Sequence, residues 1–214
     1  MTRYIQMFQT TLLALAALGI AAVPASAELP EDVTFDVFRN GSPFGEHRVE
    51  FSERADGRME VEIEIGLRVG FGPVTVFRYE HESKEVWEDG ELVSLAAMTL
   101  KDGDRTRYAL ERDDEGRLVS DAGRVGDLVP SSHWSGYAAG LPAVLNTETG
   151  EPMAVTIEDM GMDRIETVSG MIDARRFRMT GTVTVDLWYD AGGRWVGCAF
   201  SIRDQDIVYR LRDA

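Results

Sequence analysis

Apolar and polar residues alternate along most of the chain. From Met59 to Phe71 every odd position is apolar, and the even positions between them hold Glu, Gly or Arg. This period of two is typical of a β-strand with one buried and one solvent-exposed face. A second alternation, from Phe177 to Tyr189, predicts another long strand, and shorter alternations span 196–202 and 207–211. The chain is therefore predicted to consist almost entirely of strands.

Short turn signals separate these alternating runs. Pairs that end in glycine occur at Asn40-Gly41, Asp56-Gly57, Asp89-Gly90, Asp102-Gly103, Glu115-Gly116 and Gly192-Gly193. Such pairs supply the positive φ angles that tight hairpins require. We therefore expect roughly ten to twelve antiparallel strands, each joined to the next in sequence order. Only residues 132–146 are compatible with a short helix.

The length of the alternating runs favours a strongly curved sheet. Strands of up to ~13 residues exceed the length usual in globular sheets, and in a two-sheet sandwich in particular. An outer-membrane barrel is disfavoured, because Glu60, Glu62 and Glu64 would then face lipid. The predicted fold is all-β, a single antiparallel β-barrel or half-barrel with one long loop or short helix closing an end.

The N-terminus has the features of a secretory signal peptide. Arg3 is the only charged residue before Glu28, an apolar run spans 12–23, and Ala25-Ser26-Ala27 forms an Ala-x-Ala cleavage site. The apolar run is shorter than the ~20 residues that a membrane-spanning helix needs. We expect cleavage after Ala27, and residues 28–214 as a single domain in the periplasm without membrane insertion.

Composition narrows the possible partners. The chain has 22 Lys and Arg against 37 Asp and Glu, a formal net charge of −15, which disfavours nucleic acid as a partner. Cys198 is the only cysteine, so an internal disulfide is impossible, and its phase with Val196 and Phe200 predicts a buried apolar role. The three histidines lie far apart in sequence, and no glycine-rich phosphate loop is present. We expect neither a metal nor a cofactor.

Four stretches of the sequence carry a resemblance to known proteins: FDVFRNGSPFGEHRVEF, ESKEVWEDGELVSL, VPSSHWSGYAAGLPAVLNTETGE and ARRFRMTGTVTVDLWYDAGGRWV. Together they resemble a family of exported proteobacterial proteins of unknown function. That family is similar in turn to a larger uncharacterised family of exported β-barrel proteins with a comparable LWYD-x-x-x-R hairpin. The resemblance covers essentially the whole chain after the signal peptide. It implies a barrel fold and an envelope location, and it brings no catalytic residues.

One strand combines aromatic and polar residues on a single face. In the segment 77–87 the odd positions include Tyr79, His81, Glu85 and Trp87. If the aromatic residues point inward, the histidine and the carboxyl group point inward with them and need partners. The functional interpretation is a partly polar cavity with an aromatic wall. The alternative is that this part of the strand extends beyond the core to a solvated barrel mouth.

The segment 128–147, LVPSSHWSGYAAGLPAVLNT, does not have the pattern of a strand. A connection of this length is unusual in a compact domain unless it is packed or functional. Trp134 and Tyr137 are three residues apart, so in a short helix they would share one face. We expect the segment to cover one end of the barrel, with Trp134 inward, as either a lid or a plug. His133 is the third candidate ligand-binding residue of this segment.

The leading functional hypothesis is binding. The barrel interior and the segment 128–147 would hold an apolar or amphipathic small molecule, or contact an envelope protein. One alternative is a periplasmic hydrolase that uses His133 or His81 with a nearby carboxylate or serine, although the chain has no Gly-x-Ser-x-Gly motif. Another is a solidly packed structural or interaction barrel. No residue is assigned a catalytic role.

Overall fold

The computed structural model describes residues 28–71, 74–121 and 123–212. The predicted signal peptide, residues 1–27, lies outside this range. Within it the chain forms fifteen strands and no helix, so the all-β prediction is confirmed. No helix among these residues is long and apolar enough to cross a membrane.

Thirteen of the strands form one antiparallel sheet. Their order across the sheet is β11-β12-β13-β14-β15-β1-β2-β3-β4-β5-β6-β7-β8, and β9 and β10 form a separate pair. The strands are β1 (Val33–Arg39), β2 (Ser42–Glu53), β3 (Met59–Phe71), β4 (Val74–Glu88), β5 (Glu91–Lys101), β6 (Asp104–Arg112), β7 (Leu118–Ser120), β8 (Gly123–Arg124), β9 (Ala143–Leu145), β10 (Pro152–Ala154), β11 (Thr156–Thr167), β12 (Gly170–Thr180), β13 (Thr184–Tyr189), β14 (Trp195–Ile202) and β15 (Gln205–Leu211).

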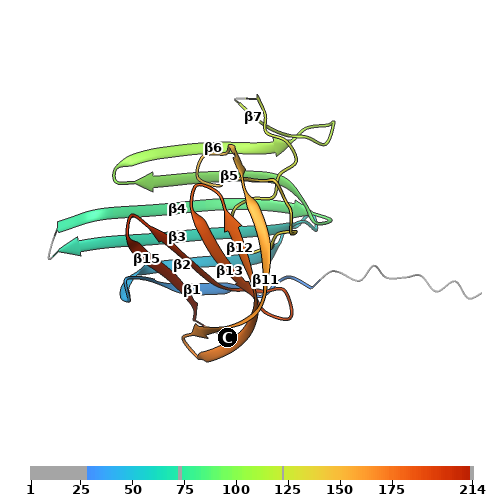
Figure 1. The fold of residues 1–214 in the computed structure, drawn as a ribbon. Helices are drawn as coiled ribbons and strands as arrows, with labels where there is room; N and C mark the ends of the chain where they lie inside the picture. Colours follow the sequence, from blue (N-terminus) through green and yellow to red (C-terminus); the bar gives the residue numbers. More distant parts are fainter. Residues whose placement is uncertain (1–27, 72–73, 122, 213–214) are drawn as a thin grey trace, which may run out of the picture.

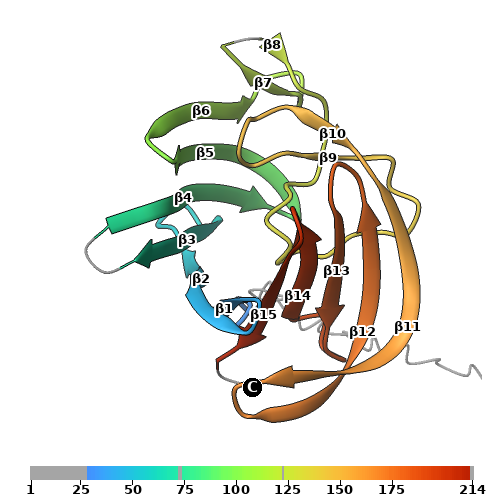
Figure 2. The same ribbon diagram turned by 60° about the vertical axis from the view of Figure 1, so that its left-hand side comes forward.

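The sheet is strongly curved but does not close into a barrel. Long strands β1 to β6 run side by side, and β11 to β15 cross them at a steep angle (Figure 1). Seen from a second side, the sheet bends from β6 through β1 and β15 round to β11, and β9 and β10 lie in the gap between its two ends (Figure 2). Of the two predicted forms, the open one is therefore present, with β8 and β11 as the sheet edges.

The predicted strand number was too low, because the sequence pattern did not reveal β7, β8, β9 and β10. Each of these strands has only two or three residues. Strands this short contain too few positions to show an alternation. They nevertheless decide how the sheet ends and how the gap between its ends is filled.

The predicted strand from Met59 to Phe71 has the same bounds as β3. Val61 and Ile63 are buried, and Glu62 and Glu64 between them are exposed. From Ile65 onward the inward residues are only half-buried, although the alternation continues. The inner face of the sheet is thus sealed at one end of β3 and open to solvent at the other.

Inward residues form rows across neighbouring strands. In one row His47 on β2 is opposite Ile65 on β3, Ile65 is opposite His81 on β4, and His81 is opposite Thr99 on β5. Since side chains on directly opposite positions point to the same face of a sheet, all four point into the curve. This row places two of the three histidines on one wall.

The alternation from Phe177 to Tyr189 is two strands and not one. The chain reverses at residues 181–183, and Thr180 on β12 is paired with Thr184 on β13. An odd number of turn residues keeps the parity of the pattern, so Phe177 and Leu187 face the same side and lie opposite each other. The period-two pattern alone does not reveal a hairpin of this kind.

Of the two alternatives for 132–146, a long loop or a short helix, the helix is absent. This region consists of turns and bends that end in β9. His133, Gly136 and Gly140 have φ angles of 71°, 70° and 81°. Positive φ angles at this spacing interrupt the helical repeat, which requires negative φ at every position.

Two-residue hairpins form at three of the predicted turns. Asn40-Gly41, Asp89-Gly90 and Asp102-Gly103 have positive φ at both positions, as a type I′ turn requires. The pair Arg203-Asp204 between β14 and β15 has the same geometry, with φ angles of 50° and 59° and no glycine. Its composition gave no turn signal.

Candidate functional site

The concave face of the sheet contains a cleft of about 270 Å³. One wall comes from β2, β3 and β4, the opposite wall comes from β12 to β15, and the floor comes from 131–133, 146–148 and β10. The lining residues are His47, Ile63, Ile65, Tyr79, His81, Ser83, Ser131, Ser132, His133, Asn146, Thr147, Glu148, Met153, Val155, Met179, Gly181, Thr182, Val183, Val185, Cys198, Phe200 and Tyr209. All three histidines of the chain therefore meet at one cleft.

The wall opposite the histidine row is largely apolar. Val185 on β13 is paired with Met179 on β12 and with Phe200 on β14, so the three side chains share one face. Cys198 lies two positions before Phe200 on the same face and is 3% exposed. The predicted apolar role of this cysteine is confirmed, and burial raises the pKa of its thiol.

His47 has the most unusual surroundings of the three histidines. It is 3% exposed, and neither Nδ1 nor Nε2 has a hydrogen-bond partner among the described residues. Its ring lies edge-on to Trp195 at 5.1 Å and to Tyr209 at 5.7 Å between centroids. Burial lowers the pKa of His47 to about 3, and the nearby His133 and His81 contribute in the same direction. His47 is therefore a neutral imidazole with an unused donor and an unused acceptor.

One ring nitrogen of His81 has a hydrogen-bond partner. Its Nδ1 hydrogen bonds with Thr99 Oγ1 at 2.9 Å, and both residues are buried. Burial lowers the pKa of His81 to about 4, although the carboxylate of Glu148 acts in the opposite direction. Glu148 itself forms an ion pair with Lys101, with 3.0 Å between Nζ and Oε1.

His133 belongs to the floor of the cleft. Its Nδ1 hydrogen bonds with the hydroxyl of Tyr137 at 2.7 Å, and its carbonyl accepts a hydrogen bond from Tyr189 at 2.8 Å. Its ring lies edge-on to Trp195, 5.5 Å between centroids. Burial lowers the pKa of His133 to about 4. These contacts hold the floor against the wall formed by β13 and β14.

The opposite end of the interior is sealed around Glu85. This residue is 0% exposed, and its Oε2 accepts hydrogen bonds from the indole N–H groups of Trp87 and Trp134, both at 2.9 Å. Trp134 also packs edge-on against Phe51 and Trp87, at 5.2 Å from each. The expectation that Trp134 points inward is confirmed, with its ring against the main core.

Among the described residues, no cation contributes to the pKa of Glu85. Burial raises the pKa of its carboxyl group, and hydrogen bonds from Trp134, Trp87 and Ser132 oppose that shift only in part. An ionised carboxylate in such a setting carries a large desolvation cost, so the protonated form is favoured. Glu85 then contributes a carbonyl oxygen to the two indoles and leaves Oε1 as the hydroxyl.

The structure separates the residues predicted as one site into two groups. Tyr79, His81 and His133 line the cleft. Glu85, Trp87 and Trp134 form the sealed end, and Tyr137 links the floor to the backbone through a hydrogen bond to Pro130 O at 3.3 Å.

Sequence reasoning missed His47 and Tyr209 as cleft residues. His47 precedes Val49 and Phe51 in an odd-numbered alternation, and that phase was the available signal. Tyr209 belongs to the predicted alternation 207–211, which does not show what its side chain faces. Ser83 shares the inward face of 77–87 with the predicted site residues, but it was not named among them. The place of Ser132 in the cleft depends on the path of an irregular segment.

The geometry offers little support for nucleophilic catalysis. A serine nucleophile requires a base within hydrogen-bond reach. The hydrogen bonds of the imidazole rings at His81 and His133 go to Thr99 and Tyr137. In the part of the chain that the structure describes, no group of three or more His, Cys, Asp or Glu residues has metal-binding proximity.

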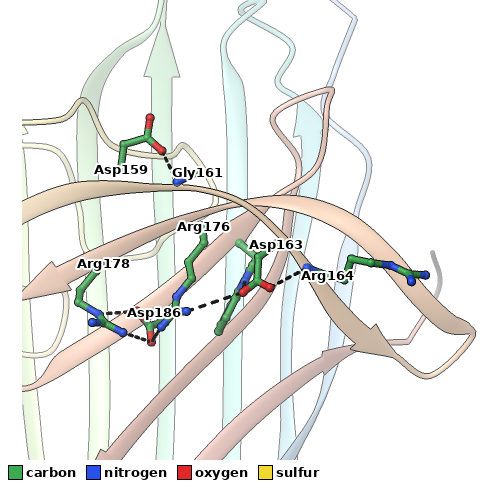
Figure 3. A network of polar contacts seen from close by, with 8 residues as sticks. Asp159, Gly161, Asp163, Arg164, Arg176, Arg178 and Asp186 are labelled. Atoms are coloured by element: carbon green, nitrogen blue, oxygen red, sulfur yellow. Dashed lines mark hydrogen bonds and ion pairs between the residues drawn. The ribbon is translucent and has the colours of Figure 1, made fainter.

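A second polar cluster lies on the outer face of β11 to β13 (Figure 3). Arg176 and Arg178 both contact Asp186, with closest N–O distances of 2.6 and 2.8 Å, and Arg176 lies 3.8 Å from Asp163. Burial opposes ionisation, but the hydrogen bonds from Arg178 and Arg176 hold the pKa of Asp186 below its usual range. Because these charges neutralise one another, the cluster is best explained as a set of structural ion pairs that link the three strands.

A larger depression of about 640 Å³ lies along the outer side of β3 to β6. It is bordered by the exposed side chains of Glu62, Glu64 and Arg107, and small Ala96 and Ala109 form part of its base. Exposed charged walls do not remove a ligand from water, so this depression is a weaker candidate than the cleft.

Comparison with known proteins agrees with the predicted resemblance. The family described as a domain of unknown function, DUF6134, matches residues 35–212. Among solved structures, the chain is similar to the crystal structure of a β-barrel-like protein of the domain of unknown function DUF1849 from Brucella abortus, with a TM-score of 0.60 and 11% identity. The similarity covers 86% of this chain and 95% of that one. In the search of curated proteins, none matches.

Proposed function

The chain belongs to the DUF6134 family, whose function is unknown, and we propose that it is an exported binding protein for a small apolar or amphipathic molecule. The observation that carries this proposal is the cleft on the concave face. Its volume of about 270 Å³ is close to the lower end of the ~300–1,000 Å³ typical of ligand pockets. A mainly apolar lining with a few polar groups is also what such sites usually have.

The cleft favours binding over the two other candidate functions. A solidly packed barrel would have apolar side chains in the place of His47, Ser83 and His81. A hydrolase would need a serine or a carboxylate hydrogen bonded to an imidazole, and the imidazole contacts go to Thr99 and Tyr137. The proposed export rests on the signal-peptide pattern of residues 1–27, and N-terminal sequencing of protein recovered from the periplasm should begin at Glu28.

A neutral fluorescent probe tests the binding proposal. N-phenyl-1-naphthylamine should gain fluorescence with the purified protein in a saturable manner. Val185→Phe extends a side chain into the cleft and should weaken probe binding by about tenfold or more, because the volume available to the ligand falls. Thr184→Phe, the neighbouring exposed position on β13, is the matched control and should leave the affinity unchanged. Equal affinities for the two variants would contradict the proposal.

A further inference from the structure

Two buried polar side chains line the cleft without a hydrogen-bond partner. His47 and Ser83 are 3% and 6% exposed. The unpartnered atoms are both ring nitrogens of His47 and the Oγ atom of Ser83, considered among the described residues. Buried polar atoms in folded proteins are nearly always hydrogen bonded, and each exception calls for an explanation. Two exceptions in one cleft have a common explanation if a ligand supplies the partners.

The two side chains belong to the same wall of the cleft. His47 is opposite Ile65, and Ile65 is opposite His81, which precedes Ser83 by two positions on the inward face of β4. The unpartnered atoms therefore lie on one wall of the cleft, whereas Met179, Val185 and Phe200 form the wall that faces them.

The charges around the cleft indicate which kind of polar group on a ligand can bind there. No Lys or Arg is among its described lining residues, and the single carboxylate, Glu148, already pairs with Lys101. The three imidazoles are neutral at neutral pH, because burial lowers their pKa values to between about 3 and 4. An anionic end would find no cation here, and an ammonium end would lose its hydration without gaining a free carboxylate.

We infer that the ligand is an uncharged amphipathic molecule whose hydroxyl, carbonyl or amide end hydrogen bonds with His47 and Ser83. This inference rests on the proposed binding function and adds the chemical class of the ligand. Neutral imidazole and hydroxyl groups each donate and accept, so they match a polar end that does the same. The apolar part of the ligand lies along Met179, Val185 and Phe200.

Three probes of equal chain length test the charge preference. 1-Octanol, octanoate and octylammonium are each titrated against protein loaded with N-phenyl-1-naphthylamine at neutral pH, and displacement of the probe is measured. 1-Octanol should bind about tenfold more tightly than either ion, because the cleft offers hydrogen bonds but no counterion. Octanoate or octylammonium binding as tightly as 1-octanol would overturn the inference.

Variants test the two named side chains. Ser83→Ala should weaken 1-octanol binding by about two- to tenfold, the usual effect of one hydrogen bond, and should leave the affinity for N-phenyl-1-naphthylamine almost unchanged. Ser94→Ala is the matched control, because Ser94 on β5 does not line the cleft. His47→Phe should weaken 1-octanol to a similar or larger extent.

The two proposals fail in different ways. If N-phenyl-1-naphthylamine does not bind, or if Val185→Phe leaves its binding intact, the binding function itself is wrong. If the probe binds in the cleft but the affinity for 1-octanol is unchanged in both polar variants, the cleft is a ligand site and the inferred class of ligand is wrong. Ser83→Ala removes only one oxygen, so it keeps the test valid even where His47→Phe fails to fold.

Discussion

The inward face of β4 passes through two different environments. At one end Glu85 and Trp87 lie under the segment 128–147, and the carboxyl oxygen Oε2 has two indole donors. A few residues earlier on the same face, His81 and Ser83 line the cleft, and the hydroxyl of Ser83 has no partner among the described residues. The same alternation thus produces a sealed interior and an open one.

The difference comes from what faces the strand. At the sealed end Trp134 supplies both apolar surface and an indole N–H, so it fills space and donates a hydrogen bond to Oε2 of Glu85. At the open end the facing residues are aliphatic or aromatic side chains of β12 to β14, which offer no hydrogen bonds. This comparison indicates that the segment 128–147 acts as a plug at one end and as a cleft floor at the other.

The largest expected effect is a loss of folding stability after substitution of Trp134 at the sealed end. Trp134→Ala removes the ring packed against Phe51 and Trp87 and one donor to Glu85, and should lower the free energy of unfolding by about 3–5 kcal/mol. Urea denaturation monitored by circular dichroism measures this loss. Trp134→Phe retains most of the packing but not the N–H, and should cost only about 1–3 kcal/mol. A loss below ~1 kcal/mol for Trp134→Ala would instead identify the segment as a loosely attached lid.

A smaller effect is expected at Glu85 and depends on pH. The pKa of this carboxyl is raised in the folded protein, so its contribution to stability is present at low pH and is lost as pH rises through the folded value. Glu85→Gln is almost isosteric with the protonated form and does not titrate. As the pH rises from 5 to 8, the variant should therefore gain stability relative to the parent protein, measured by urea denaturation across that range. A variant that becomes relatively less stable as pH rises would indicate an ionised Glu85.

The smallest effect on stability at neutral pH is expected at the cleft. Because the pKa of His47 falls to about 3 on folding, its contribution to stability is present above its ordinary value near 6.5 and is lost as pH falls toward 3. His47→Phe should make this acid-induced decline shallower by about 1 kcal/mol per pH unit below pH 6.

At pH 7 the His47→Phe variant should be as stable as the parent or more stable by about 1 kcal/mol, since it removes two unpartnered nitrogens. Thermal unfolding at a series of pH values measures both effects. Glu62→Ala, on the exposed face of β3, is the control and should leave the acid slope unchanged. A clear loss of stability at pH 7 would show that His47 has a structural partner.

Local pattern predicted most of the strands but not their ends or their mutual placement. The bounds of β3 followed from its alternation, because one buried and one exposed face dictate a period of two. The same rule merged β12 and β13, since a turn with an odd number of residues preserves the parity of the pattern. The sequence did not decide between a loop and a short helix within 132–146, and positive φ angles at His133, Gly136 and Gly140 exclude the helix.

The candidate site, too, was predictable from the sequence only in part. That Tyr79 and His81 share a face with Glu85 and Trp87 followed from the sequence, because opposite faces of a strand are set by residue parity. That His47, His81 and His133 meet at one cleft followed only from the fold, since strand pairing and the path of 128–147 bring together residues far apart in the chain.

By itself, the sequence determined the all-β class, the inward face of each long strand and the family resemblance, because these depend on neighbouring residues. The tertiary structure alone decided that the sheet stays open, that β9 and β10 occupy the gap, and that one stretch of β4 is sealed while the next is exposed to the cleft. The physical reason is that the curvature of the sheet and the packing of an irregular segment depend on contacts between distant residues, which no local period records.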